Sequence, residues 1–154
     1  MGIFSFGRPK QTLFSEQEKS VLVQAIAEQE KRTSGEIRLY IESHCVYVDP
    51  VDRAREVFHE LNMHNTAERN GVLIYIAHKD HQLAILGDEG IYKAMGADFW
   101  HQEVQKILSR FSAHDFLKGI LEIISDVGAA LVDKFPYDGN TDKNELSDDI
   151  VFGK

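Results

Sequence analysis

The chain has 154 residues, of which 43% are hydrophobic and 27% are charged, and its formal net charge is −8. This length and this balance of apolar and charged residues are typical of one soluble globular domain. The negative charge argues against a nucleic-acid partner, because phosphate binding requires a basic face.

The sequence predicts neither membrane insertion nor export. No apolar run reaches the roughly 18–20 residues that a transmembrane helix needs. Residues 1–14 lack the basic start and apolar core of a signal peptide. The single cysteine, Cys45, excludes an intramolecular disulfide. We therefore expect a cytoplasmic protein without a transmembrane segment, whose N-terminal peptide, residues 1–14, is free to dock a protein partner.

The first helix is predicted over residues 15–33. It opens with Ser15 and Glu18, which have the spacing of a capping box. Gly35 stands just past the expected end of the helix, where a glycine commonly stops one. Residues 36–43 then alternate between polar and apolar, which predicts a half-buried strand.

The central part of the chain is predicted to form a helix and a β-hairpin. Asp49 followed by Pro50 is typical of a helix start and predicts a helix over 50–62. Two short apolar runs predict strands over 72–78 and 82–87, joined by a polar turn. The first run shows no alternation, which indicates a strand buried on both faces.

The C-terminal part is predicted to be helical and then polar. A short helical piece over 91–95 precedes two long helices over 98–111 and 113–134, for which Asp98 and Ser112 are the candidate caps.

Residues 137–154 form an acidic tail that could dock a protein partner. The tail begins like a calcium-binding EF-hand loop at Asp138, but Lys143 stands where that loop needs a glycine.

This order of elements predicts an α/β fold, with residues 15–136 as a three-layer α/β/α sandwich. The sheet is mixed and mostly parallel, with the hairpin at its centre. Because a helix joins strands 36–43 and 72–78, they should be parallel, whereas the hairpin makes 82–87 antiparallel to its neighbour.

This strand polarity brings four polar residues to one edge of the sheet. Glu36 and Asn70 lie where the two parallel strands begin, and Asp88 and Glu89 follow the end of the third strand. Carboxylate and amide oxygens are the ligands that Ca²⁺ and Mg²⁺ prefer, so these four residues form a candidate divalent-cation site. The alternative is that Asp88 only caps the helical piece after it and that Glu36 is an exposed strand residue.

The opposite edge gathers side chains that suit a transition metal. His44, Cys45, His78 and His81 are expected there, and ligands of open α/β sheets usually bind at the carboxyl ends of parallel strands. The alternative is a solvated hairpin turn, in which polar residues are expected in any case.

The chain resembles the TPM-domain family, which includes bacterial proteins and a thylakoid-lumen acid phosphatase of plants. The resemblance spans about Ser15 to Pro136. Four segments in a matching order carry it. They are 34–37 (SGEI), 69–74 (RNGVLI), 85–90 (ILGDEG) and 111–124, where Phe116 and Gly119 match.

The resemblance implies an α/β/α sandwich, divalent-cation binding and, for some members, acid phosphatase activity. The chain departs from the family pattern at two positions of the candidate edge. Arg69 replaces the usual aspartate before Asn70, and Asp88 replaces an aromatic or small residue. It also lacks the signal peptide and membrane anchor of most relatives.

Two functional hypotheses follow from these observations. The first is an interaction module that binds a divalent cation through Asp88, Glu89, Glu36 and Asn70. The alternative is a metal-assisted phosphatase that acts on small phosphomonoesters, in which the ion would activate water. The second depends mainly on family analogy, so whether the chain is an enzyme stays open at this point.

Overall fold

The computed structural model describes residues 13–112, 115–137 and 150–153. The elements in chain order are α1 (Glu16–Glu30), β1 (Glu36–Glu42), α2 (Pro50–Glu60), β2 (Gly71–Ala77), β3 (Gln82–Gly87), α3 (Glu89–Met95), α4 (Ala97–Ser112), α5 (Phe116–Lys134) and β4 (Val151–Phe152). The predicted helices and strands are therefore confirmed to within a few residues.

The sheet has the strand order β3-β2-β1-β4. β1 runs parallel to β2 and to β4, and β3 runs antiparallel to β2. Every residue of β2 is buried, which confirms the interpretation of its unbroken apolar run as a strand covered on both faces. The predicted polarity of β1, β2 and β3 is also confirmed.

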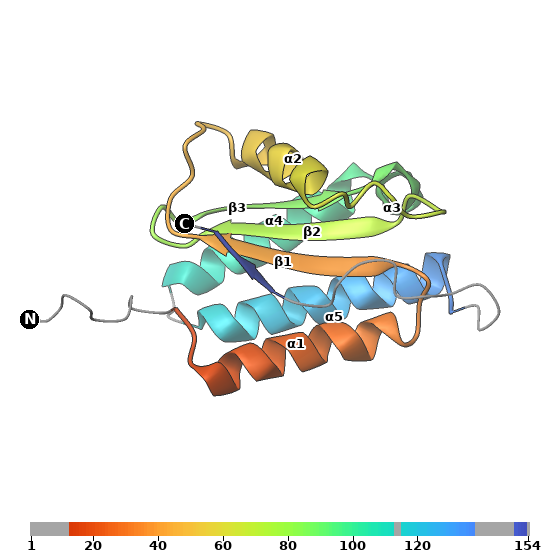
Figure 1. Cartoon of the computed structure of the whole chain (residues 1–154), viewed down its shortest axis with the longest axis horizontal. Helices are drawn as coiled ribbons and strands as arrows, with labels where there is room; N and C mark the ends of the chain where they lie inside the picture. The colour runs from red at the N-terminus through yellow and green to blue at the C-terminus, as the bar shows by residue number, and fades with distance from the viewer. Residues whose placement is uncertain (1–12, 113–114, 138–149, 154) are drawn as a thin grey trace, which may run out of the picture.

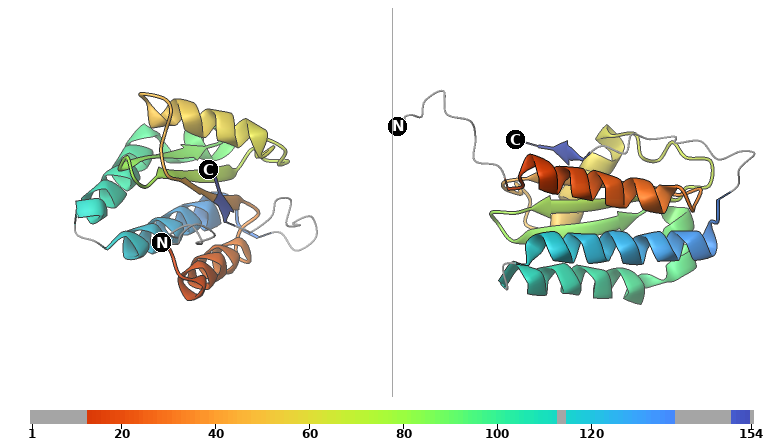
Figure 2. Two further views of the ribbon diagram at one scale, coloured as in Figure 1. Left: turned by 60° about the vertical axis from the view of Figure 1, so that its left-hand side comes forward. Right: turned by 90° about the horizontal axis from the view of Figure 1, so that it is seen from below.

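Helices cover both faces of the sheet, as Figure 1 shows. α2 lies on one face, and α1, α4 and α5 lie side by side on the other, which is clearest in the right-hand view of Figure 2. This is the predicted three-layer α/β/α sandwich.

Two apolar cores lie on the two faces of the sheet because side chains alternate along a strand. Ile37, Leu39 and Ile41 of β1 join the larger core beneath α1, α4 and α5. Tyr40 of the same strand packs against the smaller core beneath α2, which contains Tyr75 of β2.

Two predicted helix starts are confirmed. Ser15 forms a complete capping box with Glu18. Asp49 accepts a hydrogen bond of 2.9 Å from the Val51 amide, with Pro50 as the first helical residue. These caps were predictable because they depend only on neighbours in the sequence.

Three predicted caps were wrong. Ser112 is the last residue of α4, and α5 begins only after Asp115. Asp98 lies inside the first turn of α4. Gly35 does not end α1, whose C-cap is Lys31. The need for glycine at position 35 comes from tertiary packing, because a Cβ there would lie 2.6 Å from the Leu131 side chain of α5.

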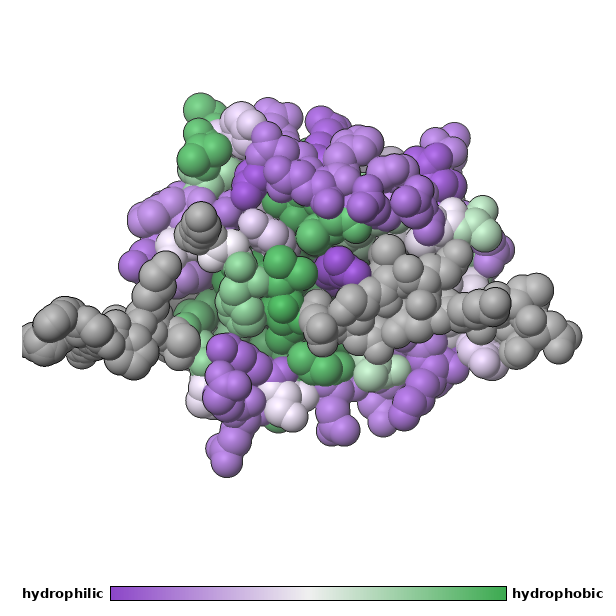
Figure 3. Space-filling view, viewed as in Figure 1, coloured by the Kyte–Doolittle hydropathy of each residue, from purple (hydrophilic) through white to green (hydrophobic). Residues whose placement is uncertain are grey.

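The acidic tail contains a strand that the sequence did not predict. Val151 and Phe152 pair with Tyr40 and Ile41 as β4, at the β1 edge of the sheet. Figure 3 shows apolar surface where β4 crosses this edge, between the polar surfaces of α1 and α2. Periodicity could not reveal a strand of two residues. The EF-hand-like start at Asp138 lies outside the described residues.

Within the part of the chain that the structure describes, no helix is long and apolar enough to cross a membrane. The prediction of a cytoplasmic location stays a prediction.

Candidate functional site

The predicted edge is formed by the start of β1, the start of β2 and the end of β3. Glu36 pairs with Gly71, and the Asp88 amide donates a 2.9 Å hydrogen bond to the Gly71 carbonyl. Asn70 precedes this pair directly, so the strand register brings the predicted residues to the same end of the sheet. We call this end of the sheet, with Glu36, Arg69, Asn70, Asp88 and Glu89, the acidic edge.

Asp88 is buried at the acidic edge and already has strong partners. Its carboxylate accepts hydrogen bonds from Arg69 Nε at 2.7 Å and Arg69 Nη2 at 2.9 Å, the bidentate arrangement typical of guanidinium and carboxylate. It also accepts a 2.8 Å hydrogen bond from the Glu89 amide. Asp88 therefore caps α3, as the alternative interpretation of this residue predicted. The hydrogen bonds to Asp88 raise the pKa of Arg69.

Asn70 has an oxygen without a partner. The side chain is 1% exposed. Its Nδ2 donates to Ser34 Oγ at 3.2 Å, and its backbone amide donates to Thr66 Oγ1 at 3.2 Å. Its Oδ1 is buried and accepts no hydrogen bond from the described residues. A buried side-chain amide oxygen without a hydrogen-bond partner is unusual, since such atoms nearly always contact a donor from the protein, a water molecule or an ion.

The loop that presents Arg69 is strained and tightly packed. Arg69 has a φ of 52°, in the left-handed region that non-glycine residues rarely adopt. The Gly90 amide donates to the Arg69 carbonyl at 2.9 Å. A Cβ on Gly90 would lie 2.3 Å from the Glu68 carbonyl oxygen. Backbone strain of this kind is often found at functional sites.

The other two predicted ligands differ in exposure. Glu36 is buried, so the alternative that it is an exposed strand residue was wrong. Glu89 is exposed and lies 3.9 Å from Arg69 Nη1. Among the described residues, no three His, Cys, Asp or Glu side chains come together closely enough to hold a metal ion. A cation at this edge would therefore depend on amide oxygens and on displacement of Arg69.

The opposite edge is a hydrogen-bonded hairpin turn. His44 Nδ1 lies 2.8 Å from Asp80 Oδ1, and the Cys45 amide donates to Asp80 Oδ2 at 2.7 Å. Burial lowers the pKa of His78. His81 adopts a φ of 53°, as turn residues often do. These contacts agree with the interpretation of this edge as a turn.

A buried polar cluster beneath α2 was missed by sequence reasoning. The buried Glu42 carboxylate accepts hydrogen bonds from Arg53 Nε at 2.9 Å and Nη2 at 3.1 Å, and from the Tyr75 hydroxyl. The hydrogen bonds to Glu42 raise the pKa of Arg53, and burial raises the pKa of Tyr75. The only signal in the sequence was Glu42 in the alternation of β1, which gave no partner.

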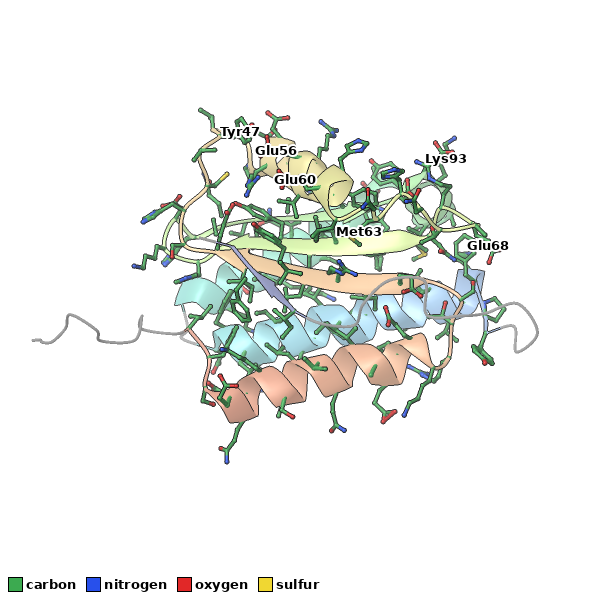
Figure 4. The ribbon with its side chains drawn as sticks, in the orientation of Figure 1. Tyr47, Glu56, Glu60, Met63, Glu68 and Lys93 are labelled. Atoms are coloured by element: carbon green, nitrogen blue, oxygen red, sulfur yellow. The ribbon has the colours of Figure 1, made fainter. Side chains whose placement is uncertain are left out.

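The buried cluster continues to the surface along α2. Arg53 Nη1 also bonds Glu56, whose Oε2 accepts a 2.7 Å hydrogen bond from the Tyr47 hydroxyl. Figure 4 shows Tyr47 and Glu56 side by side over the start of α2. Because each charge in this chain of contacts has a partner among the described residues, the cluster fixes α2 on the sheet.

A second ionisable cluster joins α4 and α5. Lys106 Nζ lies 3.1 Å from Glu103 Oε2 and 2.6 Å from Asp126 Oδ2. Glu103 is buried, and its Oε1 has no hydrogen-bond partner in the described structure. Burial outweighs the attraction of Lys106 and raises the pKa of Glu103 to about 7.

The raised pKa of Glu103 predicts a stability that falls with rising pH. Between its ordinary pKa of 4.5 and about 7, the folded protein binds this proton more tightly than the unfolded chain. We expect Glu103→Gln to match the wild type at pH 4.5 and to exceed it by about 1–3 kcal/mol at pH 8. Urea unfolding at the two pH values measures this. Glu16→Gln, at a side chain that is 90% exposed, is the control. Equal effects of Glu103→Gln at both pH values would contradict the prediction.

The TPM domain model matches residues 9–130. The chain is 38% identical to the BA42 protein of the psychrophilic bacterium Bizionia argentinensis, whose NMR structure superposes with a TM-score of 0.84 over 94% of this chain and 99% of that one.

A more distant structure shares the fold alone. The N-terminal domain of the cg2496 protein of Corynebacterium glutamicum is 12% identical, with a TM-score of 0.52 over 80% of this chain and 86% of that domain. A search of curated proteins gives no match.

Proposed function

The chain belongs to the TPM-domain family, and from that premise we propose that it is a binding module that takes a divalent cation, Ca²⁺ or Mg²⁺, at the acidic edge. The observation that carries the proposal is the unpartnered Oδ1 of Asn70. The side chain is held in place by the hydrogen bond from Nδ2 to Ser34 and the backbone by the bond from its amide to Thr66, and amide oxygens are ordinary ligands of Ca²⁺.

Asp88 supplies the charge that the cation needs. It is bound to Arg69, whose side chain is 44% exposed and can move into solvent. A divalent ion would take the place of the guanidinium beside Asp88, so the two cations compete. This competition weakens the site, and we expect a dissociation constant on the order of 1 mM, as in low-affinity calcium modules.

Removal of the competing guanidinium is expected to strengthen cation binding. With a dissociation constant of about 1 mM, 10 mM Ca²⁺ stabilises the folded protein by about 1.4 kcal/mol, which raises the melting temperature by about 3–6 °C. We expect a larger rise for Arg69→Ala and none for Asp88→Asn. Thermal unfolding with CaCl₂, against NaCl at matched ionic strength, measures the difference.

The control variant is Asp52→Asn, at an exposed carboxylate on α2, far from the acidic edge. It should respond to Ca²⁺ as the wild type does. The proposal is wrong if Ca²⁺ shifts neither the wild type nor Arg69→Ala, or if Asp88→Asn responds fully. Glu36 and Glu89 are tested in the same way by Glu36→Gln and Glu89→Gln.

The same variants test the phosphatase alternative. A metal-assisted phosphatase would release phosphate from para-nitrophenyl phosphate only with the cation present, and Asp88→Asn would abolish the release. Cation binding without phosphate release supports the binding module. A docking role for the N-terminal peptide or the acidic tail is a separate proposal, which deletion of residues 1–12 and 138–154 would test.

A further inference from the structure

The two edges of the sheet differ in how they are covered. At one edge, β1 is paired by β4 from the chain's own tail. At the other edge, β3 pairs with β2 and with no other strand of residues 13–112, 115–137 and 150–153. Open edge strands are templates for a further strand, and most proteins protect them with lysine, proline or a bulge. Residues 83–87, Leu-Ala-Ile-Leu-Gly, contain none of these.

The register of the hairpin shows which groups face outward. The Asp88 amide bonds the Gly71 carbonyl, so residues 71 and 88 form a hydrogen-bonded pair. Hydrogen-bonded and non-hydrogen-bonded pairs alternate in an antiparallel ladder. Leu83, Ile85 and Gly87 therefore turn their N–H and C=O groups away from β2. These groups form no hydrogen bond with another described residue, and because Leu83 and Ile85 are only 4% and 8% exposed, a partner would reach them through the groove described next.

A groove of about 660 Å³ lies along this edge and touches all five residues from 83 to 87. Five residues of strand span about 17 Å. Val51 of α2 lines one wall of the groove, and Trp100 and Val104 of α4 line the other. Because successive side chains of a strand point to opposite faces, a strand that enters this groove must be apolar on both faces.

The charged residues at the rim indicate the chemistry of the ends of such a strand. Arg55, Lys93 and His101 line the groove, together with Glu89. Glu89 lies beside Arg69, whereas Lys93 has no ion pair with any described residue. Figure 4 shows Lys93 at the same end of the molecule as Glu68. These cationic side chains favour carboxylates at the ends of a bound strand. The net charge of −8 does not prevent this, because at 0.15 M salt charges farther away than about 8 Å are screened.

We propose that the open edge of β3 binds an extended peptide as a fifth strand, and that this peptide is apolar at its centre and carries carboxylate side chains at its ends. Main-chain hydrogen bonds to Leu83, Ile85 and Gly87 would hold the peptide. The walls formed by α2 and α4 would select its side chains. This is strand addition, a recognised mode of peptide binding, and it does not depend on the cation proposal.

Amide hydrogen exchange is the sharpest test. The probe is the peptide acetyl-Asp-Val-Ile-Val-Phe-Asp-amide, added to the full chain at ten times its dissociation constant. Exchange at the amides of Leu83, Ile85 and Gly87 should slow about tenfold, because only the unbound fraction exchanges. The amides of Ala84 and Leu86, already bonded to β2, should change much less.

Two variants and two modified peptides separate strand addition from other kinds of binding. The same peptide N-methylated at its four central residues should not bind, and this control leaves the protein unchanged. Ile85→Pro removes one outward N–H without breaking a bond to β2 and should also abolish binding; because Ile85 belongs to the larger core, thermal unfolding must first show that this variant is folded. Lys93→Glu should weaken binding of the peptide with aspartate ends about two- to fivefold. A peptide with lysine ends should bind the Lys93→Glu variant more tightly than it binds the wild-type protein.

Three results would overturn the proposal. The first is no binding of the peptide at millimolar concentration. The second is equal binding of the N-methylated peptide, which would show that the groove takes side chains only. The third is concentration-dependent protection of the three amides in the free protein together with a dimeric mass, which would show that β3 pairs with a second copy of itself.

Discussion

Replacement of Arg53 by methionine is expected to lower the free energy of unfolding by about 3–5 kcal/mol, because it leaves the buried Glu42 carboxylate without its charge partner. Glu42 is 7% exposed and accepts two hydrogen bonds from this guanidinium. Methionine keeps an apolar stem of similar length but removes the guanidinium, whose central carbon lies 5.7 Å from the centroid of the Tyr40 ring and whose Nη2 donates to the Tyr40 hydroxyl at 3.3 Å. The loss therefore reports the broken ion pair together with these weaker contacts to Tyr40.

Urea unfolding measures the effect, and Arg55→Met is the matched control two residues along α2. Arg55 is 65% exposed and lies 3.7 Å from Asp52, so its loss should change stability by less than about 1 kcal/mol. The double variant Glu42→Gln/Arg53→Met should recover part of the loss, since no charge is then left buried. If Arg53→Met changes the free energy of unfolding as little as Arg55→Met does, the buried cluster contributes little to stability.

Replacement of Gly90 by alanine is expected to destabilise the protein by about 3 kcal/mol, because there is no room for a Cβ. The added atom would lie 2.3 Å from the Glu68 carbonyl oxygen and 2.7 Å from that of Arg69. Both are backbone atoms of a loop in which Arg69 already has a strained φ. The loop must shift, and the pairing of Arg69 with Asp88 should weaken with it.

Gly128→Ala is the control for crowding alone. Its Cβ would meet Oε1, Cδ and Cγ of Gln29 at 2.2, 2.4 and 2.5 Å, but all three atoms belong to a flexible side chain that can change rotamer, and none is a backbone atom. In the interior of α5 the alanine also gains helix propensity, so the net effect should be within about 1 kcal/mol of zero. Thermal and urea unfolding of both variants gives the comparison. A loss for Gly128→Ala as large as for Gly90→Ala would contradict the explanation.

The acidic edge shows how far a family resemblance reaches. The family and the fold are shown, and the strand polarity places the predicted residues at one end of the sheet. Arg69 then changes the chemistry of that end, because its guanidinium binds Asp88 on both oxygens. The family alone therefore does not fix the function of this chain, and the Arg69 variants decide between a free and a blocked cation site.

The sequence by itself determined the features that depend on short-range order. Apolar periodicity located the central strands and the long helices, and the caps at Ser15 and Asp49 set two helix starts. The hairpin and the helical crossover fixed the strand polarity, which placed Glu36, Asn70 and Asp88 at one edge. The helices, strands and caps follow from residues a few positions apart, and the polarity follows from the type of connection between consecutive strands.

Only the tertiary structure decided which partners those side chains have. It paired Asp88 with Arg69, buried Glu42 against Arg53 and Tyr75, and added β4 from the far end of the chain to β1. It also made β3 the edge strand of the described sheet and placed it along a groove between α2 and α4. Contacts between distant segments depend on how the layers pack, and local patterns carry no record of that packing.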